Sequence, residues 1–230
     1  MKYFISSLFL FFCLTSMAQK SSKDFVSIFN GKNLNGWHSF LKTKGVNYDP
    51  EAVFKVENNL LHISGKEFGY IMTDKVYENF DMIVEFKWGT KKFPPRDADT
   101  TKRDNGILFA IPPTTIDKVW PGGVECQIQE RDLGDIWLID SATVEIDGRR
   151  TPPTDYYRVM KKADGELPTG QWNKVEIIVN NGDITYFVNG IKVNDAKNPS
   201  RKDGRILVQS EGAEIFYRTI KIKELKKGNL

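Results

Sequence analysis

The sequence predicts an all-β protein, a β-sandwich of jelly-roll type, and three observations carry this prediction. Apolar and polar residues alternate with a period of two in many short segments, as in Phe80–Trp88. Tight-turn dipeptides separate several of them, namely Asn58-Asn59, Asn181-Gly182 and Asn189-Gly190. Beyond residue 18, no stretch of ten or more residues has a convincing helical period. Many short antiparallel strands joined by tight turns are typical of a jelly roll.

The first residues of the chain are not expected to belong to this fold. Lys2 precedes an apolar run from Tyr3 to Leu14, and small residues follow at Ser16 and Ala18. This order is typical of a secretory signal peptide, and the run is too short to span a membrane. We therefore expect a signal peptide at residues 1–18 and export of the mature chain to the periplasm or the extracellular space.

The remaining chain is expected to form one domain over residues 24–226. Its predicted strands, in order, are Val53–Glu57, Leu60–Ser64, Phe80–Trp88, Asn105–Ile111, Val124–Gln129, Val175–Val179, Ile184–Val188, Ile206–Gln209 and Ile215–Lys223. Three long segments resist strand assignment: Gly89–Asp104, Pro112–Gly122 and Asp147–Gln171. Loops of this length are uncommon unless they serve a function, so they are either solvated decoration or the walls of a site on one sheet face.

The composition excludes several classes of protein. The 33 Lys and Arg residues nearly balance 30 Asp and Glu residues, for a net charge of +3, and they are not gathered in one region. A nucleic-acid partner is therefore not expected, and no second apolar run is long enough for a membrane span. His38 and His62 have no partner at zinc-site spacing. After signal cleavage Cys126 is the last cysteine, which excludes an intramolecular disulfide.

The segment Gly123–Glu130 is the most informative for function. Its apolar residues alternate with Glu125, Gln127 and Gln129, which line one face of the strand about 7 Å apart. A carboxylate beside two amides offers donors and acceptors together, as sugar hydroxyls require. Taken by itself, such a pattern is more often that of an ordinary solvent-facing strand.

Neighbouring residues favour the sugar site over that alternative. Asn105 begins the preceding predicted strand, and Trp120 and Trp137 flank the Glu125 strand in sequence. Aromatic faces commonly pack against the apolar surfaces of ligands. We therefore expect Asn105, Trp120 and Trp137 to contact a small sugar molecule.

Other catalytic patterns are mostly missing. The chain contains no GxSxG motif and no Gly-rich phosphate loop. The segment Glu145–Asp147 resembles half of the acidic strand motif of jelly-roll glucanases, but the expected second Glu is absent. A conventional glycosidase with two paired carboxyl groups is therefore weakly supported.

Seven sequence blocks give the chain a resemblance to a known family. They are FVSIFNGKNLNGWHSF (25–40), FKVENNLLHISG (54–65), YENFDMIVEFKW (77–88), DNGILFAIP (104–112), GVECQIQE (123–130), WNKVEIIVNNGDITYFVNGIKV (172–193) and ILVQSEGAEIFYRTIKIKEL (206–225). In this order they resemble the 3-keto-disaccharide hydrolase family (3-keto-glucoside 1,2-lyase / 3-keto-2-hydroxyglucal hydratase), once catalogued as a domain of unknown function. The opening and closing blocks are the most distinctive.

The resemblance implies a concanavalin A-like jelly roll that acts on 3-keto-glucosides, with Glu125 and Gln127 in its pocket. The chain departs from the family pattern in three places. Ala110 stands where the family often has Arg, Glu130 where it usually has Asp, and Glu211 in place of a frequent His.

The chemistry implied by the resemblance needs few residues. A ketone at C3 acidifies the C2 proton, so a base can remove it and the C1 substituent is expelled by β-elimination; hydration then completes a net hydrolysis. We expect Glu125 as the base, oriented by Gln127, and Glu130 as the acid for the leaving oxygen or as a metal ligand.

Positive charge is needed where the C3 oxygen becomes negative. The candidates are Arg103, Lys161, or a divalent cation held by Glu125 and Glu130, and the sequence does not choose among them. Glu211 is expected to contact the substrate. Two other functions stay open: a non-catalytic carbohydrate-binding module and a conventional glycoside hydrolase on the same fold.

Overall fold

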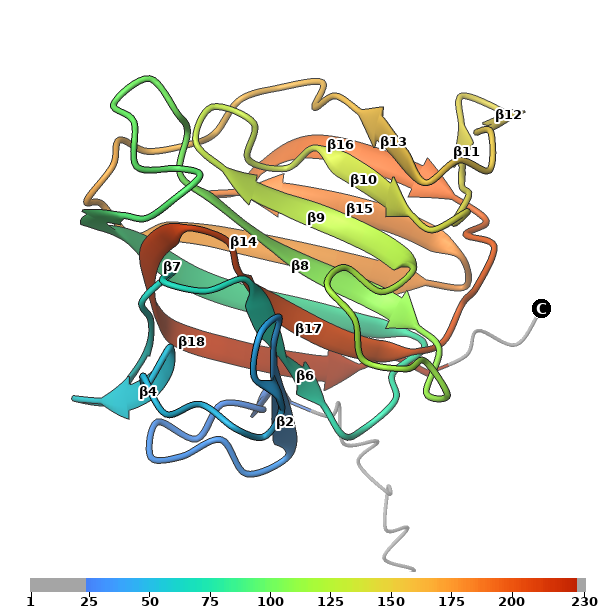
Figure 1. Cartoon of the computed structure of the whole chain (residues 1–230). Coiled ribbons are helices and arrows are strands. Elements are labelled where there is room, and N and C mark those ends of the chain that lie inside the picture. Colours follow the sequence, from blue (N-terminus) through green and yellow to red (C-terminus); the bar gives the residue numbers. More distant parts are fainter. Residues whose placement is uncertain (1–23, 227–230) are drawn as a thin grey trace, which may run out of the picture.

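The structure, a computed structural model, describes residues 24–226, so the predicted signal peptide lies outside the described residues. Within that range the strands form two antiparallel sheets stacked face to face, and the predicted all-β sandwich is confirmed (Figure 1). None of these residues belongs to a helix long and apolar enough to cross a membrane.

Over the described residues, the strands lie in the following order of hydrogen-bonded neighbours in the two sheets. The ten-stranded sheet contains β12 (Arg149–Arg150), β11 (Glu145–Ile146), β16 (Ile191–Lys197), β15 (Asp183–Val188), β14 (Asn173–Asn180), β7 (Phe80–Lys92), β18 (Ala213–Glu224), β5 (Leu60–Ile63) and β4 (Phe54–Glu57), with β1 (Val26–Ser27) also paired to β18. The eight-stranded sheet contains β13 (Tyr156–Val159), β10 (Ile136–Ile139), β9 (Gly123–Gln129), β8 (Asp104–Ile111), β17 (Arg205–Ser210), β6 (Gly69–Thr73), β2 (Trp37–Leu41) and β3 (Gly45–Val46).

The strands predicted from alternation are all present, with ends shifted by a few residues at most. The hairpin turns are confirmed as well. Asn189 and Gly190 have φ of 50° and 87° between the paired residues Val188 and Ile191. Both torsion angles are positive, as a two-residue hairpin turn requires.

Several strands escape the alternation pattern. The most important are β6, β10 and β13, and β13 corrects the expectation that Asp147–Gln171 is free of strands. Every residue of β6 is buried, and three of the four residues of β10 are. A strand covered on both faces has no polar side and therefore shows no period of two.

The main core lies between the sheets, and a second apolar cluster lies on the outer face of the eight-stranded sheet. That second cluster is formed by Tyr70, Met72, Leu108, Ile111, Ile139 and Leu207. The loop 112–122 covers it: Trp120 packs against it, and the Tyr70 hydroxyl donates a hydrogen bond of 2.6 Å to Asp117.

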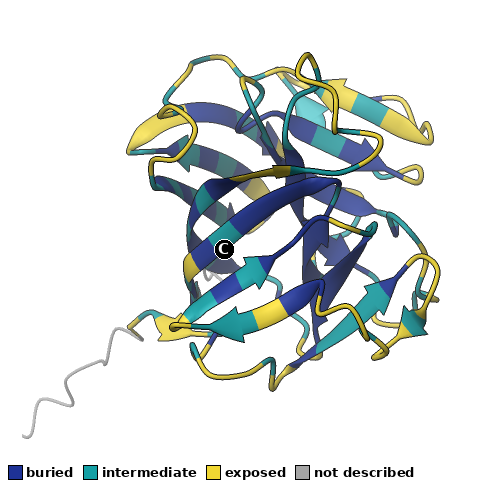
Figure 2. Cartoon of the chain, turned by 60° about the vertical axis from the view of Figure 1, so that its left-hand side comes forward, coloured by how far each residue is buried: buried dark blue, intermediate teal, exposed yellow. Residues whose placement is uncertain are grey.

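One part of this outer face is therefore closed by the loop, and the part formed by β8, β9 and β10 is left for a site. Figure 2 shows buried residues along most of the strands, whereas exposed residues gather mainly in the connecting loops.

Candidate functional site

Strand β9 carries the predicted polar row on the outer face of its sheet. Val124, Cys126 and Ile128 point into the core, which turns Glu125 and Gln127 outward, as the alternation predicts. The two side chains are not solvent-facing, however, because Glu125 is only 5% and Gln127 only 6% exposed. They form the floor of an enclosed pocket.

This pocket, called the Glu125 pocket below, has a volume of about 230 Å³. Its lining comes from several strands and loops: Arg96, Asp104, Trp120, Glu125, Gln127, Gln129, Trp137, Ile139, Tyr156, Gln209 and Glu211. Of the residues predicted from sequence, it brings together Glu125, Gln127, Trp120, Trp137 and Glu211. Trp137 stands directly beside Glu125, because the two residues pair across β10 and β9.

A glycine makes room for the carboxyl group at the floor of the pocket. Gly106 on β8 pairs with Gln127, and a Cβ atom built on it would lie 1.7 Å from Glu125 Oε1. The same Cβ would lie 2.7 Å from Gln209 Oε1. Any side chain at this position would displace both oxygens, so the bare backbone of Gly106 is a condition for the site.

Three carboxyl groups share the pocket with one guanidinium group. Arg96, from the loop after β7, donates hydrogen bonds to Asp104 and, at 2.8 Å, to Glu211. Gln127 donates to Asp104 at 2.9 Å, and Gln129 also donates to Asp104. Gln127 therefore holds Asp104, which corrects the expectation that it orients Glu125.

The excess of carboxyl groups shifts their proton affinities upward. Burial raises the pKa of Asp104 to about 6, against the opposing effect of Arg96. Burial and the neighbouring Asp104 raise the pKa of Glu211 to about 8. Burial, together with Glu211 and Asp104, raises the pKa of Glu125 well above its usual range. Burial therefore favours the neutral, protonated form of Glu125, which speaks against the expectation of a resting carboxylate base.

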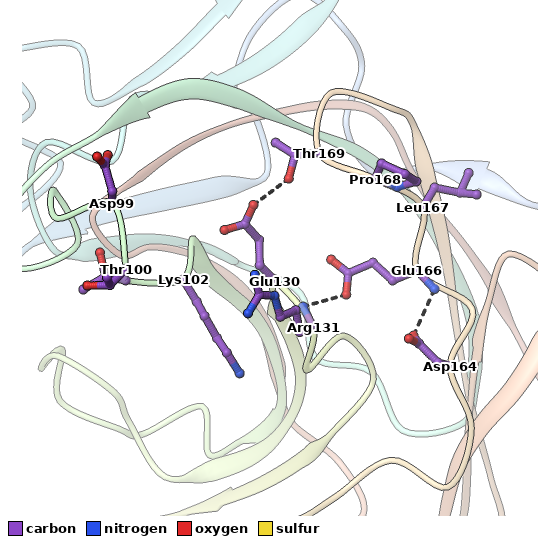
Figure 3. Close-up of a pocket in the computed structure, with 11 residues that line it drawn as sticks. Asp99, Thr100, Lys102, Glu130, Arg131, Asp164, Glu166, Leu167, Pro168 and Thr169 are labelled. Carbon is purple, nitrogen blue, oxygen red and sulfur yellow. Dashed lines mark hydrogen bonds between the residues drawn. The ribbon is translucent and has the colours of Figure 1, made fainter.

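Two of the predicted residues, Glu130 and Arg103, belong to a different place. Glu130 lines a separate cavity of about 640 Å³ beyond the end of β9, called the Glu130 pocket below (Figure 3). It accepts hydrogen bonds of 2.9 Å from both Nη1 and the backbone N–H of Arg103, and one of 2.6 Å from Thr169. These bonds outweigh burial and lower the pKa of Glu130.

Lys161 and Asn105 do not line the Glu125 pocket either. Lys161 Nζ pairs with Asp164 at 2.8 Å, and its backbone N–H donates to Asp135. Asn105 is fully buried and points toward the core, where it accepts a hydrogen bond of 2.6 Å from the Tyr217 hydroxyl of the opposite sheet. We therefore remove both residues from the predicted substrate contacts.

The sequence analysis missed Asp104, Gln209 and Arg96. Strand parity could have found the first two, since Asp104 lies two positions before Gly106 on β8 and Gln209 lies on a predicted strand. Arg96 had no such signal. It comes from an irregular loop, and only the folded chain shows that it reaches the carboxyl cluster.

The predicted metal pair does not form. Glu125 and Glu130 line separate pockets, and the Glu130 carboxylate already accepts hydrogen bonds from Arg103 and Thr169. Across residues 24–226, no three His, Cys, Asp or Glu side chains are grouped as metal ligands. The donor set therefore does not fit the divalent cation considered from the sequence.

Comparisons with known proteins agree with this fold. The family model of the 3-keto-alpha-glucoside-1,2-lyase-like domain matches residues 24–223, whereas no curated protein sequence matches the chain. A proposed glycosyl hydrolase from Parabacteroides distasonis ATCC 8503 is similar in structure, with a TM-score of 0.61, 20% identity, and 88% of this chain and 94% of that chain covered.

Two more distant structures share the sandwich. A β-glucanase from Bacillus licheniformis has a TM-score of 0.55 and 10% identity over 90% of this chain and 100% of its own. The carbohydrate-binding module CBM66 from Bacillus subtilis has a TM-score of 0.50 and 10% identity over 82% of this chain and 96% of its own. At these identities the likeness establishes the fold, which enzymes and binding modules share.

Proposed function

The chain belongs to the 3-keto-alpha-glucoside-1,2-lyase-like domain family, and from this premise we propose that it cleaves the glycosidic bond of 3-keto-glucosides by elimination followed by hydration. Family membership already makes a carbohydrate-active, glycosyl hydrolase-like function the coarse assignment. One observation supports the finer proposal: the Glu125 carboxyl group, with its pKa raised by burial, lies beside two further carboxyl groups in a small pocket.

The proposed first step requires a base and an acid in one place. Glu211, with its pKa raised to about 8, is the base that removes the C2 proton, because a carboxylate that holds protons this tightly is a strong one. The electron pair left at C2 moves toward C3, and negative charge develops on the C3 oxygen. Glu125, in its protonated form, hydrogen-bonds to that oxygen and transfers its proton to it as the charge develops, giving an enol.

The next steps complete the balance of atoms. The C1–O bond then breaks, and its oxygen takes the proton that Glu211 removed from C2. The proton on the C3 oxygen returns to Glu125, so the C3 ketone is restored and a double bond forms between C1 and C2. Water then adds at C1, a proton returns to C2, and the products are a 3-keto sugar and the released alcohol. The net reaction is hydrolysis, without oxidant or reductant.

The other residues of the Glu125 pocket position these two carboxyl groups. Arg96 bridges Asp104 and Glu211, so the anionic Asp104 keeps the guanidinium group at the base. Trp120 and Trp137 offer aromatic faces for the ring of the substrate. A pocket of about 230 Å³ is below the range of drug-sized ligand sites, which suits a single sugar ring.

A conventional glycoside hydrolase finds less support. Glu145, from the partial glucanase motif, lies on β11 in the other sheet and pairs with Arg150 at 2.9 Å. Glu145 therefore takes part in a surface ion pair and lines neither of the two pockets described above. The carboxyl groups of the Glu125 pocket instead have raised pKa values, which suits an elimination that needs one acid and one base.

The direct test supplies the purified protein with a 3-keto-glucoside and, separately, with the unoxidised parent glucoside. Loss of the keto sugar alone, with release of the alcohol, is the expected result. Turnover of the parent glucoside would instead indicate conventional hydrolysis, and saturable binding without turnover would indicate a binding module.

We also propose that the protein works after export, in the periplasm or outside the cell, on the basis of the predicted signal peptide at residues 1–18. Cell fractionation with an antibody, followed by N-terminal sequencing of the mature chain, tests this location. Recovery of an uncleaved chain in the cytoplasm would refute it.

A further inference from the structure

Two buried polar atoms on residues of the Glu125 pocket, Arg96 Nε and Gln209 Oε1, have no hydrogen-bond partner among the described residues, and Gln209 Oε1 is the acceptor of the two. Gln209 is 2% exposed and lines the pocket, and its side-chain Oε1 is buried without a hydrogen-bond donor. A buried acceptor left unsatisfied costs about 1–3 kcal/mol, so such atoms in native proteins call for an explanation. A donor group on a bound ligand provides one here.

This free acceptor lies beside the acid of the proposed mechanism. Both Gln209 Oε1 and Glu125 Oε1 occupy the space above Gly106, as the hypothetical Cβ distances of 2.7 Å and 1.7 Å show. The Gln209 amide also acts on the neighbouring Glu125 carboxyl group, whose pKa it lowers against the larger effect of burial. Because the amide N–H₂ is the only donor of that side chain, its carbonyl oxygen is the atom left over for a ligand.

Gln209 is held in place from behind the sheet. Asn105 Nδ2 donates a hydrogen bond of 2.5 Å to the backbone oxygen of Gln209, and the Tyr217 hydroxyl fixes Asn105 Oδ1 at 2.6 Å. Both Asn105 and Tyr217 are fully buried. The acceptor is therefore presented on a rigid strand, as a selective contact requires.

We propose that Gln209 is a specificity-determining residue: its Oε1 accepts a hydrogen bond from a sugar hydroxyl adjacent to the carbonyl that Glu125 binds. This inference rests on the proposed function for the identity of that carbonyl. A protonated carboxyl group beside a lone acceptor forms a donor–acceptor pair, and a ketone next to a hydroxyl is its complement. In a 3-keto-glucoside the adjacent hydroxyl is the one on C2 or on C4, so the recognised chemical class is an α-hydroxy ketone.

The test measures binding without turnover. The Glu125→Gln variant keeps a donor at the ketone but cannot transfer a proton, so it holds the ligand unreacted. Calorimetry measures the binding of three ligands: methyl 3-keto-glucoside and its 2-deoxy and 4-deoxy analogues. Each ligand is titrated into Glu125→Gln alone and into the double variant Glu125→Gln with Gln209→Met. The matched control is a second double variant, Glu125→Gln with Gln171→Met, because Gln171 carries an exposed amide outside the pocket.

In Glu125→Gln, loss of one of the two hydroxyls is expected to weaken binding about 10- to 100-fold. When Gln209→Met is added, the Kd of the parent ligand should rise by a similar factor. Removing that hydroxyl from the ligand should then raise the Kd less than about threefold further. The Gln171→Met control should bind the parent ligand more tightly than the deoxy analogue by the same factor as Glu125→Gln alone. The inference would be overturned if removing a hydroxyl from the ligand reduced the affinity equally with and without the Gln209 amide. The absence of any saturable binding would overturn it as well.

The proposed function is judged separately, by turnover in the wild-type protein. Turnover without coupling between Gln209 and a hydroxyl leaves the function standing and removes the inference. Coupling without turnover leaves Gln209 as a recognition residue of a binding site and removes the function.

Discussion

Glu125 and Glu130 come from the same short stretch of chain, yet their surroundings move their pKa values in opposite directions. Glu130, just after β9, is bonded to Arg103 and Thr169, and its pKa is lowered. Glu125, within β9, faces Asp104 and Glu211 across a buried floor, and its pKa is raised. The deeper burial of Glu125, together with its two carboxyl neighbours, raises its pKa, whereas hydrogen bonds from Arg103 and Thr169 outweigh the weaker burial of Glu130.

The comparison shows that cavity size does not locate the reactive group. The Glu130 pocket is the larger, at about 640 Å³ against about 230 Å³. Its Glu166 also has a raised pKa, about 7, but a backbone N–H of Arg131 already binds that carboxyl group (Figure 3). The Glu125 pocket instead combines carboxyl groups that retain protons with an acceptor that lacks a donor. Perturbed groups of this kind are typical of functional sites.

The largest expected effect separates the two glutamates directly. Glu125→Gln should lower kcat for a 3-keto-glucoside about 10²- to 10⁴-fold, because an amide cannot give up a proton in the transition state. The melting temperature should change little, since the neutral Gln side chain has nearly the shape of the protonated Glu125 that burial favours. Steady-state kinetics and thermal unfolding measure the two quantities.

Glu130→Gln is the matched control for this comparison, and its kcat should stay within about threefold of the wild-type value. Equal losses of activity in the two variants would contradict the assignment of the reactive site to the Glu125 pocket.

The pH dependence of the rate is the second expected effect. If Glu211 is the base, kcat/KM should rise steeply from pH 6 through pH 8 and level only about one unit above that, since the ionised fraction of a group with a pKa of about 8 grows from about 1% at pH 6 to about half at pH 8. The rate should fall again only where Glu125 loses its proton. The two apparent pKa values belong to the coupled cluster. A profile that is flat between pH 5 and 8 would exclude Glu211 as the base.

How far the sequence predicts these features depends on the local pattern. Alternation and Asn-Gly turns predict β9, β14 and β15 well, because each strand has one buried and one polar face. The same rule misses β6, whose outer face is covered by the loop 112–122. Strand parity also puts Glu125 on the site face without any knowledge of the fold.

The charge environment of the site could not be predicted in the same way. Arg96, Asp104 and Glu211 meet only because a loop, β8 and the turn after β17 converge in space. Their mutual repulsion decides which carboxyl group keeps its proton, so the roles of acid and base follow from tertiary contacts. This is why the sequence analysis named Glu125 as the base.

Gly106→Ala should test whether the floor of the Glu125 pocket needs a bare backbone. The new Cβ would stand 1.7 Å from Glu125 Oε1, so Glu125 and Gln209 must move. We expect kcat/KM to fall at least about tenfold and the free energy of unfolding to fall by about 1–3 kcal/mol, typical of overpacking. Gly122→Ala, whose Cβ would be 3.1 Å from Asp140 Cβ, is the control and should cost less in both measurements.

Glu211→Gln should reveal the energetic cost of the crowded carboxyl groups. A pKa raised from about 4.5 to about 8 on folding means that the folded chain binds this proton more tightly. The stability from Glu211 is therefore complete below pH 4.5 and is lost as pH rises toward 8, with a slope of up to about 1.4 kcal/mol per pH unit. The variant should unfold at a higher temperature than the wild type at pH 8. An unchanged slope between pH 5 and 8 would assign the shift to other groups.

Glu130→Gln should show the opposite pH dependence. The pKa of Glu130 is lowered in the folded chain, so its stabilisation is present above the unfolded value near 4.5 and is lost as pH falls through the folded value. At pH 7 the variant should lose about 1–3 kcal/mol, because Arg103 keeps a mostly buried guanidinium group without its anion. The difference from the wild type should shrink as the pH is lowered toward 4. Opposite slopes for Glu130→Gln and Glu211→Gln in denaturant titrations would show that one carboxyl group stabilises the fold while the other strains it, and parallel slopes would contradict that division.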